Sequence, residues 1–365
     1  MGIGHRCGLR RGFRTHPLPA VTVPGVLFRV DVGPTIGLGH INRCVALAEA
    51  IRLRGLQGVF LLAPSCGGAN GVSQRGFPVE TLNECVTGTR KDSAVVIAAA
   101  ERHGYSTVVV DSYAARAEYL SRLRSAGLQV VAVDDEARDP TPAHILINGG
   151  AHAGGLAYRS LSGDTQLLLG PDYALLRSEF WSCPPRAIAG SVRRVLVTVG
   201  GDDRQNLTVR LIEWLVGRLE AGTALDVVIG PFFGGADAVE RVAAGSPLNI
   251  RLISAPEHLR DLMMESDLAV CAGGQTTYEL AVTGTPAVAM DVFENQAHGV
   301  QALARSGALI YGGRPTNDRL PEELGPAIRE AVECSARRQR LSSAGRALVD
   351  GQGALRAAAE IARAA

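Results

Sequence analysis

The chain has 365 residues, of which 46% are hydrophobic and 20% charged, and its formal net charge is +1. This length accommodates two domains with separate cores, and near neutrality gives no electrostatic footprint for nucleic acid or a membrane surface. No apolar run is long enough to cross a bilayer, so we expect a cytoplasmic protein without a membrane span and without a nucleic-acid partner.

The lysine and cysteine content makes several further kinds of functional site improbable. Lys91 is the only lysine among the 37 basic residues, which disfavours a Walker-type phosphate loop and a Schiff-base enzyme because both need a lysine. The seven cysteines form no Cys-x-x-Cys pair, so we expect reduced thiols, no structural zinc and no cofactor.

Residues 1–25 are basic and proline-containing, without the apolar core of a secretory signal, and we expect a disordered extension there. Residues 26–185 alternate apolar runs with amphipathic helical patterns, which predicts a parallel sheet covered by helices. Its predicted strands are residues 26–32, 58–63, 107–111, 128–134, 143–147 and 166–169.

A stretch rich in proline and glycine over residues 170–191 predicts an interdomain linker. A second α/β series covers residues 190–350, with predicted strands at 195–199, 225–229, 250–253, 268–271, 287–290 and 308–311. Residues 351–365 predict a C-terminal helix that crosses back to the first domain. The fold class is therefore α/β, with two doubly wound Rossmann-like domains facing a cleft.

The most informative stretch of the first domain is the glycine loop that ends at His40. Gly37 and Gly39 let backbone approach a ligand closely, and the following helix N-terminus offers unpaired N–H groups. His40 lies at the carboxyl edge of the predicted sheet and is our candidate catalytic base, with Asp31 to orient it and Arg43 as a nearby cation. An ordinary βα turn with a capping histidine is the competing interpretation, because the third glycine of the dinucleotide fingerprint is missing.

The second domain carries a similar turn, Gly273-Gly274, followed at once by a predicted helix. Its N-terminus and the hydroxyls of Thr276 and Thr277 suit a diphosphate without a metal. Glu279 lies about one turn inside the helix, where a carboxylate can accept the hydroxyls of a ribose. An ordinary capped helix with an exposed glutamate is the alternative.

Other polar groups follow predicted strands of the second domain. Gly200-Gly201 forms a third glycine turn, and Asn295 and Gln296 follow the strand at 287–290. Three carboxylates at 134–136 and two at 202–203 raise the question of a metal. Strand-end aspartates commonly cap turns, and a helix N-terminus already supplies counter-charge, so we expect none.

Taken in order, these motifs resemble the UDP-sugar hydrolases of pseudaminic acid biosynthesis and their spore-coat polysaccharide relatives. These proteins have the GT-B glycosyltransferase architecture, as does the lipid II N-acetylglucosaminyltransferase. The resemblance covers roughly residues 26–350 and rests on residues 29–43, 109–113, 133–135, 170–177, 200–201, 272–280 and 294–296.

The resemblance implies a role for each motif. His40 would activate water, the turn at 273–277 would bind diphosphate, Glu279 the ribose, and Asn295 or Gln296 the sugar. Two departures lie near the presumed donor phosphates. Gln275-Thr276 stands where the family usually has Ser-Thr, and Gly201-Asp202-Asp203 replaces a more usual Ser-Asp.

Our leading hypothesis is a metal-independent nucleotide-sugar hydrolase in which water, deprotonated by His40, attacks the anomeric carbon and UDP leaves. An inverting glycosyltransferase is the first alternative, with an acceptor pocket around Ser112, Tyr113 and His152. A non-catalytic protein that binds a nucleotide sugar is the second. We expect a monomer, with a UDP-sugar or other nucleotide sugar as its partner.

Overall fold

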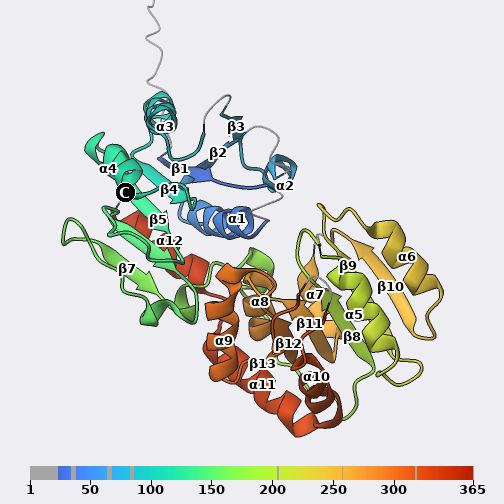
Figure 1. Ribbon diagram of the computed structural model, residues 1–365. Coiled ribbons are helices and arrows are strands. Elements are labelled where there is room, and N and C mark those ends of the chain that lie inside the picture. The colour runs from blue at the N-terminus through green and yellow to red at the C-terminus, as the bar shows by residue number, and fades with distance from the viewer. Residues whose placement is uncertain are drawn as a thin grey trace, which may run out of the picture.

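The computed structural model describes residues 24–33, 38–63, 68–82, 86–203, 205–256, 258–316 and 319–364. Figure 1 shows two α/β units, each built on its own sheet, which confirms the predicted fold class. Of the predicted N-terminal extension, residues 1–23 lie outside the described part of the chain. No helix among the described residues is both long and apolar enough to span a membrane.

The first sheet has seven strands in the order β3-β2-β1-β4-β5-β6-β7, and every strand pair is parallel. Its strands are β1 (Gly25–Val30), β2 (Gln57–Leu62), β3 (Val79–Thr81), β4 (Thr107–Asp111), β5 (Gln129–Val133), β6 (Ile145–Asn148) and β7 (Gln166–Leu169). Its helices are α1 (Gly39–Arg52), α2 (Ala69–Gln74), α3 (Arg90–His103) and α4 (Ala117–Ser125).

The second sheet has six parallel strands in the order β10-β9-β8-β11-β12-β13. Its strands are β8 (Arg194–Thr198), β9 (Ala224–Ile229), β10 (Asn249–Ser254), β11 (Leu268–Ala272), β12 (Ala287–Met290) and β13 (Ile310–Tyr311). Its helices are α5 (Leu207–Val216), α6 (Ala236–Ala244), α7 (Leu259–Glu265), α8 (Gln275–Thr283), α9 (Ala297–Arg305), α10 (Leu324–Glu333) and α11 (Ser335–Leu348).

Both sheets reverse their strand order once, between β1 and β4 in the first domain and between β8 and β11 in the second. Loops that leave two such strands diverge to opposite faces, which opens a crevice at the carboxyl edge of the sheet. The glycine loop before His40 follows β1, and the turns at Gly200 and Gly273 follow β8 and β11. The topology therefore brings the predicted motifs to the two crevices.

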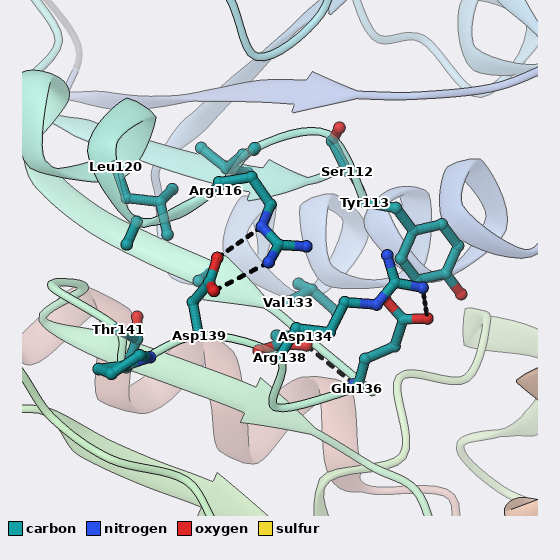
Figure 2. Close-up of a pocket in the computed structure, with 15 residues that line it drawn as sticks. Ser112, Tyr113, Arg116, Leu120, Val133, Asp134, Glu136, Arg138, Asp139 and Thr141 are labelled. Atoms are coloured by element: carbon teal, nitrogen blue, oxygen red, sulfur yellow. Dashed lines mark hydrogen bonds and ion pairs between the residues drawn. The ribbon is translucent and has the colours of Figure 1, made fainter.

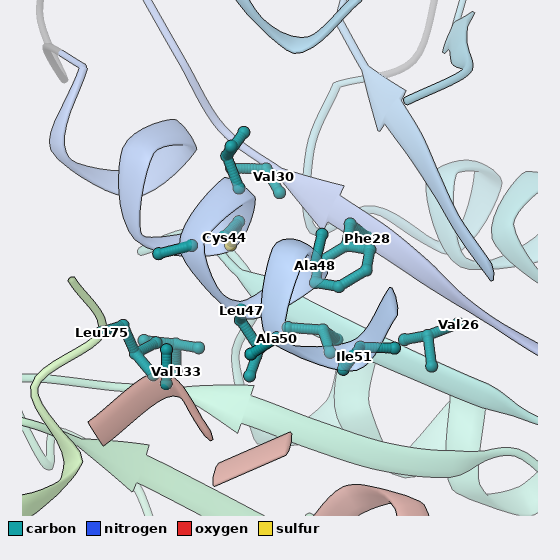
Figure 3. Packing of buried hydrophobic residues seen from close by; sticks show 14 of the residues in the cluster. Val26, Phe28, Val30, Cys44, Leu47, Ala48, Ala50, Ile51, Val133 and Leu175 are labelled. Carbon is teal, nitrogen blue, oxygen red and sulfur yellow. The ribbon is translucent and has the colours of Figure 1, made fainter. Parts of the chain in front are cut away.

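Helix α1 packs on β1 because its apolar residues recur at helical spacing. Leu47, Ala48 and Ile51 are fully buried against Phe28 and other apolar side chains of the sheet (Figure 3). Full burial of a side chain such as Leu47 or Ile51 contributes about 1.5–3 kcal/mol. This packing fixes the start of α1, and with it His40, at the sheet edge.

The C-terminal helix α12 (Gly353–Ala364) crosses back to the first domain, as predicted. Ala354, Ala357, Ala358 and Ile361 are fully buried in the same core as α1 (Figure 1). The three alanine side chains, at helical spacing, let α12 lie close to α1. The preceding helix α11 packs on α8 of the second domain, so the end of the chain ties the two domains together.

Two arginines, one partly and one fully buried, hold the linker between the domains. Arg186 donates to the carbonyls of Met263 at 2.9 Å and Met264 at 3.1 Å, at the end of α7. Arg338 is fully buried and donates to the carbonyls of Ala189 at 2.8 Å and Gly190 at 3.0 Å. Backbone carbonyls outside regular elements are thereby satisfied, and the linker has a defined path.

Candidate active site

His40 is the second residue of α1 and is only 5% exposed. Its Nδ1 lies 3.0 Å from Oδ1 of Asp111, the last residue of β4. The two atoms lie within hydrogen-bond distance, and the contact is an ion pair when the imidazole is protonated. Val30 pairs in register with Asp111, so the loop that leaves β1 for α1 begins beside the end of β4.

Arg43 fixes the charge of Asp111 from one turn further along α1. Its Nε lies 2.6 Å from Oδ2 and its Nη2 2.6 Å from Oδ1, a bidentate pair. Burial alone would raise the pKa of Asp111, but the Arg43 guanidinium and the His40 ring outweigh burial and hold this pKa well below its usual range. An ionised Asp111 favours the proton of His40 on Nδ1, which leaves the Nε2 lone pair free to act as a base.

The sequence-based expectation that Asp31 orients His40 is wrong. Asp31 accepts hydrogen bonds from Thr87 Oγ1 at 2.9 Å and from Ser112 Oγ, and it does not contact the imidazole. Successive strand side chains point to opposite faces of a sheet. Val30 faces α1, whereas Arg29, two residues before Asp31, pairs with Asp92 on α3. Asp31 thus ties the loop after β4 to the end of β1.

Tyr113 follows β4 and joins His40 to the second domain. Its ring meets the His40 ring edge-on, with centroids 4.7 Å apart. Its hydroxyl accepts a hydrogen bond from Asn295 Nδ2 at 3.1 Å and donates to Asp135 Oδ2 at 3.4 Å. Burial, followed by the Asp135 charge, raises the pKa of Tyr113 well above its usual range, so the hydroxyl keeps its proton.

A small cavity of about 50 Å³ lies beside Tyr113, between the loops that follow β4 and β5 (Figure 2). Its charged side chains pair with one another, Arg116 with Asp139 and Arg138 with Glu136. The Arg138 guanidinium also lies 5.7 Å from the centre of the Tyr113 ring. This space fits a few waters or a small polar substituent of a ligand.

Across the cleft, the turn after β11 depends on two glycines. Gly274 has φ 109°, which favours glycine, and a Cβ on Gly273 would lie 2.4 Å from Val300 Cγ2. Gln296 braces the adjacent loop, because its Oε1 accepts from the backbone N–H of Val292 at 3.0 Å and of Phe293 at 3.2 Å. The expectation that Gln296 contacts a sugar stays a prediction.

Helix α8 begins at this turn, and within the described chain no side chain caps its N-terminus. Thr277 is buried and donates its hydroxyl to the Gly274 carbonyl at 2.6 Å, so only Thr276 keeps a hydroxyl at the surface. The expectation that the Thr277 hydroxyl faces a diphosphate is therefore wrong, and diphosphate binding at Thr276 and the helix N-terminus stays a prediction. The side-chain amide of Gln275 donates a hydrogen bond to the Leu175 carbonyl at 2.6 Å and so holds the interdomain linker at residues 170–191.

Glu279 is 3% exposed, which excludes its alternative interpretation as an exposed helix residue. Its Oε1 accepts from Arg177 Nη2 at 3.0 Å, and Arg177 also contacts Glu179 Oε1 at 3.1 Å. Burial raises the pKa of Glu279, and the Arg177 charge opposes that shift. Sequence reasoning missed Arg177 as a partner, although it ends the motif at residues 170–177.

Four more glycines were predicted as site residues, namely Gly37, Gly39, Gly200 and Gly201. Gly200 has φ 105°, and Leu38 of the first domain approaches Gly201, where an added Cβ would lie 3.5 Å from Leu38 Cγ. Gly39 has open space around its Cα, whereas Gly37 lies outside the described residues.

Asp203 has a structural role at the start of α5. Its Oδ1 accepts from the backbone N–H of Leu207 at 2.7 Å, and its Oδ2 accepts from that of Thr208 at 2.7 Å. Within the part of the chain that the structure describes, no group of three or more His, Cys, Asp or Glu side chains could hold a metal ion.

Comparisons with known proteins show which sequences and folds this chain resembles. No family model matches the chain. The spore coat polysaccharide biosynthesis protein SpsG of Bacillus subtilis is 23% identical over 339 residues, which cover 90% of this chain and 95% of SpsG. The UDP-2,4-diacetamido-2,4,6-trideoxy-beta-L-altropyranose hydrolase of Campylobacter jejuni is 24% identical over 285 residues, which cover 77% of this chain and 97% of the hydrolase.

An uncharacterised archaeal relative, MJ1062 of Methanocaldococcus jannaschii, is 22% identical over 274 residues. The match covers 71% of this chain and 54% of the relative, so the chain spans about half the length of that protein.

Solved structures show the same architecture. MurG of Acinetobacter baumannii superposes with a TM-score of 0.66 at 15% identity, covering 93% of this chain and 100% of MurG. Anabaena HepE, determined with UDP and glucose, gives 0.59 at 16% identity, covering 93% of this chain and 99% of HepE. The chain therefore has the two-domain GT-B fold and is related in sequence to SpsG and to the UDP-sugar hydrolase of the pseudaminic acid pathway.

Proposed function

We propose that the protein is a nucleotide-sugar hydrolase of polysaccharide biosynthesis that releases UDP and a free sugar. The observation that carries this proposal is the contact of His40 Nδ1 with Asp111, which is itself held by Arg43. A buried histidine oriented by an ionised carboxylate is the arrangement of a general base. The named activity of the Campylobacter jejuni relative supports the same reaction.

In the proposed reaction, His40 Nε2 removes a proton from water as the water oxygen attacks the anomeric carbon. The bond between that carbon and the β-phosphate oxygen breaks, and UDP leaves with the electron pair. Asp111 stabilises the imidazolium that forms, and the uncapped N-terminus of α8 faces the leaving diphosphate. General-base catalysis of this kind contributes about 10²–10⁴-fold in rate.

An inverting glycosyltransferase would use the same base on an acceptor hydroxyl, and the glycosyltransferase fold of the structural neighbours supports this second candidate. The named activity of the Campylobacter jejuni relative, which this chain matches over 97% of that relative's length, favours water as the acceptor. A protein that only binds nucleotide sugars has no need for the buried assembly of His40, Asp111 and Arg43.

The test is UDP release from UDP-glucose and UDP-N-acetylglucosamine without an added acceptor. Wild type should release UDP, and His40→Asn should lose about 10²–10⁴-fold in rate while binding UDP nearly as well. His103→Asn is the matched control, because His103 pairs with Glu80 at the far end of α3. UDP release that depends on an acceptor would indicate a transferase, and binding without turnover would indicate a binding protein.

A further inference from the structure

Asp135, two residues after the end of β5, carries an oxygen without a partner. Its Oδ2 accepts from Arg43 Nη1 at 3.0 Å and from Tyr113 Oη at 3.4 Å. Its Oδ1 is buried and has no hydrogen-bond partner among the described residues. Leaving a buried acceptor unpaired costs about 1–3 kcal/mol, and more for a charged group. A hydrogen-bond donor from a bound ligand would therefore satisfy this oxygen.

The position of Asp135 places this oxygen beside the candidate base. Strand β5 pairs with β4, so Asp135 and Asp111 end neighbouring strands, and Arg43 bridges their carboxylates. Tyr113 contacts both the His40 ring and Asp135. A ligand whose reacting carbon lies at His40 thus brings its neighbouring substituents to Asp135.

The charge of Arg43 does not by itself explain why an acidic residue stands at position 135. Asp111 already pairs with Arg43 through both carboxylate oxygens, and Asp135 adds only one contact through Oδ2. Burial would raise the pKa of Asp135, but Arg43 and His40 outweigh it and lower this pKa, so the group is a carboxylate. A carboxylate oxygen without a partner in the described part of the chain, on a side chain that is 26% exposed, suits a hydrogen-bond donor of a ligand.

We propose that Asp135 Oδ1 accepts a hydrogen bond from a hydroxyl or amide N–H group of the sugar ring of the bound nucleotide sugar. This inference rests on the proposed function and adds the class of sugar. Asp111 and Asp135 share the single charge of Arg43, so this edge is negative in sum. The site therefore selects sugars that offer hydrogen-bond donor groups there and disfavours uronic acids.

The test measures dissociation constants of UDP, UDP-N-acetylglucosamine and UDP-glucuronic acid by calorimetry, in a His40→Asn background that keeps the sugars intact. Asp135→Asn preserves size, and its amide oxygen can stay with Arg43, which leaves an NH₂ group facing the sugar donor. Asp135→Ala is the second variant. Asp139→Asn is the matched control, because it removes the same charge four residues further along the same loop, where Asp139 pairs with Arg116.

Both Asp135 variants should bind UDP as the background does. The advantage of UDP-N-acetylglucosamine over UDP should fall about tenfold or more, since the lost bond is to a charged acceptor. The discrimination against UDP-glucuronic acid should fall as well, and Asp139→Asn should change neither ratio. Unchanged ratios, or an equal loss of affinity for UDP and the UDP-sugars, would overturn the role of Asp135. Failure of the background protein to bind UDP would instead contradict the proposed function.

Discussion

His40 Nδ1 and Asp111 Oδ1 lie 3.0 Å apart although the two residues belong to different βα units. They meet because β1 and β4 are neighbours at the point where the strand order of the first sheet reverses. The helix that begins after β1 supplies His40 and Arg43, and the end of β4 supplies the carboxylate between them. The fold itself thus assembles the candidate base.

The charge of Asp111 should also appear in the stability of the protein. Its folded-state pKa is lowered, so it stabilises the fold above the unfolded pKa of about 3.9, and this contribution is lost as pH falls through the folded pKa. Asp111→Asn should therefore cost roughly 3–5 kcal/mol at pH 7, and the deficit should persist at pH 5 and narrow below about pH 4.

Urea unfolding midpoints of wild type and Asp111→Asn at pH 7, 5 and 3.5 measure this difference. Asp139→Asn is the control, because its ion pair with Arg116 is partly exposed and worth at most about 1 kcal/mol. A deficit that disappears between pH 7 and pH 5 would contradict the assigned charge state.

A substitution of Glu279 tests whether the second domain binds the ribose of the nucleotide. If it accepts the ribose hydroxyls, Glu279→Gln should weaken UDP and UDP-sugar binding by similar factors of about tenfold to a hundredfold, because the lost bonds are to the shared nucleotide. Calorimetry measures both affinities. Glu179→Gln is the matched control, since it removes the other carboxylate partner of Arg177.

A second comparison uses 2′-deoxy-UDP. It should bind wild type weakly and lose little more in Glu279→Gln, because the missing hydroxyl and the missing carboxylate belong to one interaction. Equal UDP affinity in wild type and Glu279→Gln would place the ribose elsewhere.

Two glycine substitutions should separate packing from ligand approach. A Cβ on Gly273 would lie 2.4 Å from Val300 Cγ2, so Gly273→Ala should destabilise the protein by about 1–3 kcal/mol. Gly39→Ala meets no atom within 4 Å, so its stability should stay within about 0.5 kcal/mol of wild type. If a ligand approaches the backbone there, turnover should still fall by about tenfold or more. Thermal unfolding and UDP release measure the two effects, and unchanged turnover in Gly39→Ala would remove Gly39 from the site.

Metal removal tests the role of the α8 N-terminus. We propose that its N–H groups and dipole provide the positive charge for the leaving diphosphate, so EDTA should leave the rate of UDP release unchanged. Restoration of a lost rate by Mg²⁺ or Mn²⁺ would bring the carboxylates of Asp134 and Asp202 back into consideration as ligands.

The alternation of apolar runs and helical patterns was enough to predict both parallel sheets, and the two-domain fold then led us to expect the return of α12. It missed β3 (Val79–Thr81), because three partly exposed residues at a sheet edge carry no periodic signal. The motifs also located His40 and the turn at Gly273, since each follows a buried strand directly.

The sequence did not predict which side chains of distant segments contact one another. The expected partner of His40, Asp31, is near it in the chain, but the Asp31 carboxylate accepts from Thr87, just before α3, and Asp111 contacts the imidazole instead. The buried Glu279 forms an ion pair with Arg177, which belongs to the interdomain linker at residues 170–191. Only the assembled fold shows which opposite charges meet. The end of β4 did carry a signal, namely an aspartate that closes a fully buried strand.

Hydrolysis in ¹⁸O-labelled water tests the central claim most directly. With a UDP-sugar that wild type turns over, mass spectrometry of both products should find the label in the anomeric hydroxyl of the released sugar and none in UDP. His40→Asn should slow the appearance of labelled sugar by about 10²–10⁴-fold. Label in the β-phosphate of UDP would mean attack at phosphorus, and it would contradict a water activated by His40 at the anomeric carbon.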